Sequence, residues 1–123
     1  MRDIESLVGV PFEYGGRGPD TYDCYGLVMK IMSWEGIKLP DYKSPESQGP
    51  IAAMMATQLP LWRTTQQKQG SVVLIRIGRH ISHCGYMLDD ELMIHAWEKT
   101  GGVTVQRTQD WAQRIVGFYR YVG

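Results

Sequence analysis

The sequence predicts an α+β fold in which N-terminal helices pack on an antiparallel sheet of five to six strands. Two observations support this prediction. Apolar residues recur at helical spacing in the first part of the chain, and short β-like runs separated by turn residues fill the part after Gly70. Helices that come first, followed by a meander of strands, are typical of the α+β class.

The first half of the chain contains the predicted helices. Residues 2–8 are expected to form one short helix. The main helix is expected to begin after Asp23, because this carboxylate can accept a hydrogen bond from the first turn, and to end at about Gly36. A further helix is expected over residues 51–59.

Strand-like runs dominate the second half of the chain. A short helical turn is expected over residues 108–114, between the fourth and fifth strands. If the second and third strands form a hairpin, His83 and His95 are expected to lie roughly opposite each other. In chain order the predicted strands cover residues 71–77, 83–88, 91–97, 102–107 and 115–122.

Length and charge exclude several classes of function. The chain has 123 residues and is expected to be a single domain, residues 1–123. Its 13 basic and 13 acidic residues are scattered, so no basic stripe is present and nucleic acid is not an expected partner. No apolar run approaches the roughly 20 residues that cross a bilayer, and no secretory signal is recognisable. We therefore expect synthesis in the cytoplasm and no membrane insertion.

Cys24 is the candidate nucleophile. It stands at the start of the main predicted helix, directly after a glycine-rich loop at residues 11–23. A helix N-terminus carries about half a unit of positive charge, which favours a thiolate, and its free N–H groups can hold a developing oxyanion. The second cysteine, Cys84, is expected to be buried, inert and turned away from the cleft, because it alternates with His83 along a strand.

Two histidines complete the candidate catalytic group. His83 is the candidate general base, and His95 on the next predicted strand is the candidate that orients its imidazole. His80 is expected on the turn before the strand. An alternative interpretation makes these histidines and Cys84 zinc ligands, but their spacing lacks the paired signatures of structural zinc sites. We therefore expect no metal and no cofactor.

The order of these motifs resembles the NlpC/p60 family of cysteine peptidases. The family's nucleophile segment is similar to residues 11–28, PFEYGGRGPDTYDCYGLV, and its histidine segment to residues 80–96, HISHCGYMLDDELMIHA. GIKLPDY at residues 36–42 and KQGSVVLI at residues 68–75 fit the stretches between them. The likeness runs from about residue 10 to residue 108.

The resemblance implies a papain-like fold that cleaves amide bonds in the stem peptides of cell-wall peptidoglycan. By this resemblance Cys24 is the nucleophile, His83 the base and His95 the third polar residue. Phe12 stands where the family often has a tyrosine that assists at the oxyanion, so that help is expected from Tyr14 or from backbone donors. The resemblance also implies substrate or oxyanion positions at residues Tyr14, Asp23 and Tyr25, with Tyr25 narrowing the cleft near the leaving group.

The loop has the sequence GGRGPD before the Asp–Cys pair and an aromatic residue after that pair, and in this it resembles the phage members of the family. This implies a place in a virion tail, action on the host cell wall and other tail-tip proteins as partners. A second hypothesis is a structural tail-tip component that retains the fold with little or no catalysis, motivated by Phe12 and Tyr25. A third is an acyltransferase or amidase that uses the same thioester.

Overall fold

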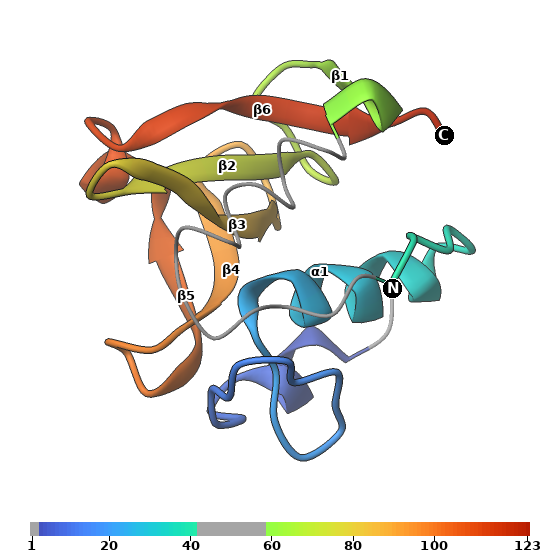
Figure 1. Cartoon of the computed structure of the whole chain (residues 1–123), viewed down its shortest axis with the longest axis vertical. Coiled ribbons are helices and arrows are strands. Elements are labelled where there is room, and N and C mark those ends of the chain that lie inside the picture. The colour runs from blue at the N-terminus through green and yellow to red at the C-terminus, as the bar shows by residue number, and fades with distance from the viewer. Residues whose placement is uncertain (1–2, 42–58) are drawn as a thin grey trace.

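One α-helix packs against a six-stranded antiparallel sheet in the computed structural model, which describes residues 3–41 and 59–123 (Figure 1). The α+β class predicted from the sequence is confirmed. The strands are arranged in the order β1-β6-β2-β3-β4-β5. Their bounds are β1 Trp62–Thr64, β2 Val72–Ile77, β3 His80–Met87, β4 Leu92–Trp97, β5 Gly102–Arg107 and β6 Ile115–Tyr121.

The helix α1 spans Cys24–Trp34 and agrees with the sequence prediction at both ends. At its start, the carboxylate of Asp23 accepts a hydrogen bond from the backbone N–H of Gly26 at 2.6 Å, so Asp23 is the N-cap. Beyond its end, Gly36 has a φ of +81°, a left-handed conformation that glycine adopts without strain.

The other predicted helices have different outcomes. The helix expected over residues 2–8 is a short 3₁₀ turn, η1 Ile4–Leu7, because the chain beyond it leaves to pair with β5 through hydrogen bonds between Val103 and residues 9 and 10. The helix expected over residues 51–59 lies, except for its last residue, outside the described residues; that last residue opens the 3₁₀ turn η2 Leu59–Leu61. A third 3₁₀ turn, η3 Thr108–Trp111, occupies the start of the helical turn expected there.

The five predicted strands correspond to β2 through β6, with shifts at their ends. The three-residue edge strand β1 was not predicted, because it is too short to show an alternating pattern. The second predicted strand starts earlier than expected, so His80 opens β3 instead of lying on the turn before it.

The register between β3 and β4 corrects one expectation. Tyr86 pairs with Ile94 and Met87 with Met93, so that continuation of the ladder sets His95 opposite Gly85 and two residues from His83. The two histidines are therefore diagonal neighbours on the pleated sheet. A Cβ atom at Gly85 would lie 3.2 Å from the Cβ of His95, so the glycine leaves room for the imidazole.

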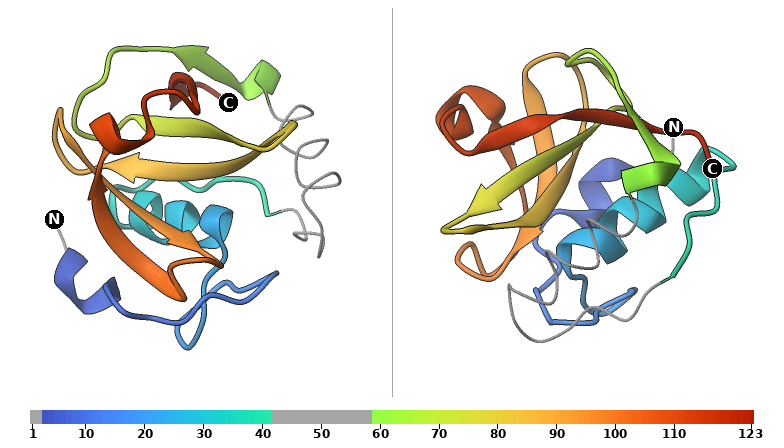
Figure 2. Two further views of the ribbon diagram at one scale, coloured as in Figure 1. Left: turned by 90° about the vertical axis from the view of Figure 1, so that its left-hand side faces the viewer. Right: turned by 45° about the horizontal axis from the view of Figure 1, so that its top comes forward.

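Apolar side chains cover both faces of the sheet. Because neighbouring residues of a strand point to opposite faces, β2, β3 and β4 each contribute to two separate buried clusters. Figure 2 shows α1 lying along one side of the twisted sheet. The cluster that includes α1 takes Val72, Leu74, Cys84, Tyr86, Ile94 and Ala96 from the strands. The second cluster contains Val73, Ile75, Ile77, Met87, Met93 and Trp111.

A β-bulge in β3 precedes the candidate base. Ile75 of β2 pairs with His83, whereas the next residue, Arg76, pairs with Ile81, so Ser82 is an extra residue in β3. Bulges interrupt the alternation of side chains and change the direction of the residues beside them.

Within the described residues, no helix has the length and the apolar character needed to span a bilayer.

Candidate active site

The glycine-rich loop is joined to the start of α1 through the buried carboxylate of Asp23. Asp23 is only 2% exposed and accepts three hydrogen bonds. The donors are the N–H of Gly26 at 2.6 Å, the guanidinium of Arg17 at 2.8 Å and the N–H of Gly15 at 3.1 Å. A buried carboxylate is tolerated only when its oxygens are satisfied in this way. Asp23 therefore positions the loop and the helix end, and its oxygens are occupied.

Arg17 extends this network to the segment after α1. Its Nε donates to Asp41 at 2.9 Å, and its guanidinium carbon lies 5.6 Å from the ring centroid of Tyr25. Tyr25 is 4% exposed, and its hydroxyl donates to the carbonyl of Pro40 at 2.5 Å. In this arrangement Tyr25 anchors the segment after the helix. The narrowing of the cleft expected from Tyr25 stays a prediction, since its ring is buried and its hydroxyl is occupied by Pro40.

Close backbone approach at Gly26 explains why the loop and the helix can meet. A Cβ atom at this position would lie 2.1 Å from the carbonyl oxygen of Gly16, a distance that real Cβ atoms essentially never show. Because the obstructing atom belongs to the backbone, any larger residue would push the loop away from α1. Gly26 is therefore a structural requirement of the helix start.

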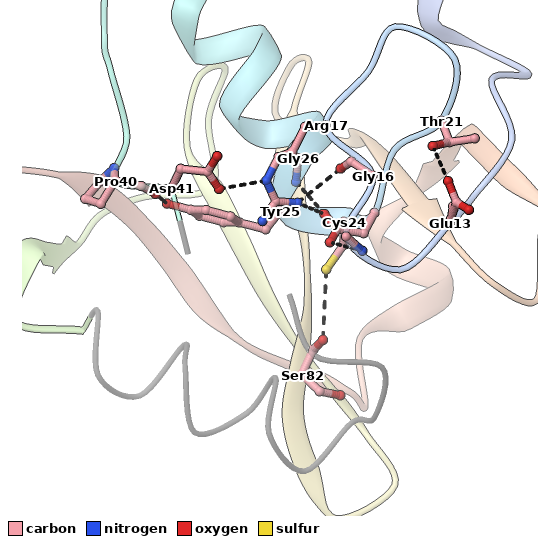
Figure 3. A network of polar contacts seen from close by, with 12 residues as sticks. Glu13, Gly16, Arg17, Thr21, Cys24, Tyr25, Gly26, Pro40, Asp41 and Ser82 are labelled. Atoms are coloured by element: carbon pink, nitrogen blue, oxygen red, sulfur yellow. Dashed lines mark hydrogen bonds and ion pairs between the residues drawn. The ribbon is translucent and has the colours of Figure 1, made fainter. Parts of the chain in front are cut away.

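Cys24 is the first residue of α1 and is 6% exposed. Its Sγ lies 4.0 Å from the carbonyl oxygen of Ser82 in β3 (Figure 3). Ser82 directly precedes His83 in the chain. No hydrogen bond joins Sγ to the His83 ring in the structure of residues 3–41 and 59–123. Within the described residues, the sulfur is therefore linked to the backbone next to the candidate base, without a hydrogen bond to its ring.

The second cysteine does not have the environment expected for it. Cys84 is buried as predicted, but its side chain faces Cys24 instead of turning away from it. The pKa of the Cys84 thiol is raised well above its ordinary value by a hydrogen bond with Cys24 and by burial. The reason for this placement is the strand alternation, which puts Cys84 in the cluster that packs on α1.

The two candidate histidines form a buried pair. Nε2 of His83 lies 2.7 Å from Nδ1 of His95, and the two residues are 2% and 0% exposed. Their rings pack against Trp97 and Trp111. Burial, together with the nearby His95, lowers the pKa of His83 well below its ordinary value. Burial also lowers the pKa of His95, although its hydrogen bond to Gln106 acts in the opposite direction.

Two further residues extend this pair and were missed by the sequence analysis. Nε2 of His95 lies 2.6 Å from Oε1 of Gln106, and the same oxygen accepts a hydrogen bond from Nε1 of Trp111 at 3.2 Å. Gln106 lies on β5 and Trp111 ends η3. Neither belongs to a segment with a recognisable motif, because what distinguishes them is contact with residues distant in the chain.

Tyr14, the candidate oxyanion donor, is engaged by a carboxylate. Its hydroxyl donates to Oε2 of Glu98, and this hydrogen bond, with smaller contributions from burial and from the charges of Glu98 and Cys24, raises the pKa of Tyr14 to about 12. The ring of Phe12 packs edge-on against Tyr14, with the ring centroids 5.0 Å apart.

Among the described residues, no three His, Cys, Asp or Glu side chains are gathered so as to hold a metal ion.

Relatives of this chain carry the names of probable endopeptidases. The probable endopeptidase p60 of Listeria grayi is 27% identical over 118 residues, which cover 96% of this chain and 21% of the relative. A probable endopeptidase of Mycobacterium tuberculosis is 31% identical over 99 residues, which cover 80% of this chain and 22% of the relative. The chain thus spans about a fifth of the length of these relatives.

Solved structures share the fold. An NlpC/P60 family protein from Bacillus cereus superposes with a TM-score of 0.69 at 18% identity, over 95% of this chain and 37% of that chain. The P60 domain of antigen MAP1204 from M. avium subspecies paratuberculosis gives 0.67 at 21% identity, over 96% and 88%. These similarities confirm the papain-like fold predicted from the sequence. Since the model of the NlpC/P60 family matches residues 9–120, this chain belongs to the NlpC/P60 family.

Proposed function

We propose that this chain is a thiol-dependent peptidase that hydrolyses amide bonds in the stem peptides of peptidoglycan. The observation that carries the proposal is the position of Cys24, which starts α1 with its Sγ 4.0 Å from the carbonyl of Ser82, directly before His83. The buried hydrogen bond between His83 and His95 supports it further. Relatives named probable endopeptidases support the same class of reaction.

In the proposed reaction, Sγ of Cys24 attacks the carbonyl carbon of the amide. His83 accepts the thiol proton and returns it to the leaving amine, and water then hydrolyses the thioester. The backbone N–H of Cys24, at the positive end of α1, stabilises the oxyanion. His95 holds the imidazole of His83 in its orientation.

The imidazole of His83 is expected to be uncharged in the resting state. Burial and His95 lower the pKa of His83, so its ring is uncharged near pH 7. Among the described residues no hydrogen bond joins Sγ to the ring, and we expect this contact to form when substrate binds, as catalytic hydrogen bonds commonly do. We therefore expect proton transfer to accompany the attack on the substrate instead of preceding it.

Mass spectrometry of peptidoglycan fragments tests this function. The wild type is expected to release new amino termini from purified peptidoglycan, and Cys24→Ala and His83→Gln are expected to release none above background. His80→Gln, at an exposed histidine of the same strand, is the matched control and should retain cleavage. Equal fragment patterns from wild type and Cys24→Ala would exclude the peptidase function.

The biological setting we propose is a phage tail tip that acts on the host cell wall, with other tail-tip proteins as partners. Support comes from the sequence of the loop at residues 11–23, which resembles that of phage members of the family. A structural tail component without catalysis is the competing function, favoured by Phe12 in place of tyrosine and by the burial of Tyr25. Immunogold labelling of phage particles tests the location, and the fragment assay separates the two functions.

A further inference from the structure

A series of connected hydrogen bonds leads from the candidate base across three strands. It starts at Nε2 of His83 on β3, continues through both ring nitrogens of His95 on β4, and reaches Oε1 of Gln106 on β5. The indole of Trp111, at the end of η3, joins the same oxygen. Both imidazoles and the indole are buried, at 2%, 0% and 7% exposure.

The direction of each hydrogen bond in this series follows from the bond at Trp111, where the series ends. An indole N–H can only donate, so the atom of Gln106 that faces Trp111 must be the amide oxygen. The same oxygen faces Nε2 of His95, which must therefore carry a hydrogen. A neutral imidazole has one N–H, so Nδ1 of His95 is an acceptor, and Nε2 of His83 must donate to it.

One nitrogen remains for base catalysis. With its hydrogen on Nε2, the neutral ring of His83 has its lone pair on Nδ1. Among residues 3–41 and 59–123, no hydrogen bond involves this nitrogen. The lowered pKa values of His83 and His95 agree with two neutral rings. A base that is already unprotonated and holds its free lone pair at one defined atom is prepared to accept a thiol proton.

We propose that Gln106, held by Trp111, is a positioning residue that sets the tautomers of His95 and His83 and leaves Nδ1 of His83 as the basic nitrogen. The catalytic meaning of this inference rests on the proposed function, since the proton that Nδ1 accepts is that of the Cys24 thiol. The tautomers themselves are a property of the folded chain and can be measured without substrate.

Two substitutions separate the role of the acceptor from simple packing. Gln106→Met keeps the side-chain length but removes the oxygen, so the N–H of His95 loses its buried acceptor and its hydrogen is favoured on Nδ1. His83 must then present its own Nδ1–H form, or lose the hydrogen bond, and the base is lost. Gln106→Glu keeps an acceptor for both His95 and Trp111 but adds a negative charge, which favours a protonated His95.

The experiment records long-range ¹H–¹⁵N correlation spectra of histidine-labelled protein, together with peptide hydrolysis. In the wild type, His83 and His95 are expected as Nε2–H tautomers. Gln106→Met is expected to change the tautomer of His83 and to lower kcat at least about tenfold with little change in KM. Gln106→Glu should retain the Nε2–H forms and shift the acidic limb of the pH profile to higher pH. The exposed Gln109→Met is the matched control and should change neither readout.

Two results would overturn the inference: an Nδ1–H form of His83 in the wild type, or wild-type tautomers that persist unchanged in Gln106→Met. The wild-type spectrum decides the first point even if a variant does not fold. The expected tautomers in a wild type that hydrolyses no peptidoglycan would instead refute the proposed function while leaving the hydrogen-bond chain intact.

Discussion

At the scale of single residues, the two cysteines have different chemical environments although both are buried. Cys24 starts α1, beside the unpaired backbone N–H groups of the helix end. Cys84 lies within β3, and its pKa is raised well above the ordinary thiol value by the hydrogen bond with Cys24 and by burial. Only a thiolate is strongly nucleophilic, so this difference should appear as a difference in reactivity.

We predict that iodoacetamide at pH 7 alkylates Cys24 at least about tenfold faster than Cys84 in the folded protein. The measurement is peptide mapping by mass spectrometry at several reaction times. In denaturant the difference should disappear, because both thiols then have ordinary environments. Faster modification of Cys84 in the folded protein would contradict the assignment of Cys24 as nucleophile.

Tyr14 gives a second prediction at this scale. Its pKa of about 12 is due chiefly to the hydrogen bond with Glu98. Glu98→Gln removes the carboxylate charge, so the pKa of Tyr14 should fall toward the ordinary value of about 10. NMR titration of ¹³Cζ-labelled tyrosine measures this. Glu13→Gln changes an exposed carboxylate that accepts a hydrogen bond from Thr21; it is the control and should leave the Tyr14 titration unchanged.

At the scale of elements, the start of α1 depends on residues that lie before it. Asp23 caps the helix through Gly26 and also receives the guanidinium of Arg17, so one carboxylate joins the loop to the helix. Removing a cap costs about 0.5–2 kcal/mol, and removing one partner of a buried ion pair costs more. Both losses occur together at this position.

Asp23→Ala is therefore predicted to lower the free energy of unfolding by about 2–4 kcal/mol. Urea denaturation followed by circular dichroism measures the loss. Asp20→Ala changes an exposed aspartate of the same loop and should alter stability by less than about 0.5 kcal/mol. Similar losses in the two variants would mean that the buried network does not hold the helix start.

At the scale of the whole molecule, the buried histidine pair couples stability to pH. The unfolded chain binds a proton at each histidine with a pKa of about 6.5, whereas burial lowers the pKa of His83 and His95 in the folded state. Above about pH 6.5 both states hold neutral rings, and this contribution to stability is fully present. As the pH falls below that value, only the unfolded chain takes up these protons, so the folded state loses stability.

We predict that the free energy of unfolding decreases between pH 6.5 and pH 5 by up to about 1.4 kcal/mol per pH unit for each buried histidine. Urea denaturation at a series of pH values gives the slope. His83→Gln should reduce the slope, whereas His80→Gln changes an exposed histidine and should not. The carboxylates contribute equally to all three proteins, so the comparison isolates the buried ring. An unchanged slope in His83→Gln would show that His83 takes up its proton equally in the folded and unfolded states, which would contradict a lowered pKa.

Local patterns were sufficient to predict several elements. The cap at Asp23, the helix up to the region of Gly36 and the five longer strands depend on residues that are neighbours in the chain, and the structure agrees with them. The edge strand β1 was too short for a pattern. The α+β class followed from the order of these elements. The expected hairpin also predicted the contact between His83 and His95, although the expected register of the hairpin was wrong by two residues.

The sequence by itself therefore determined where α1 and the five longer strands form, because capping and periodicity are interactions within about four residues. Tertiary structure alone decided which groups meet across the fold. It placed Cys84 beside Cys24 and brought Tyr25 into contact with Arg17 and Pro40. It also joined Gln106 and Trp111 to the histidine pair through hydrogen bonds. These contacts depend on strand register and on the bulge in β3, where a shift of one residue turns every side chain to the opposite face.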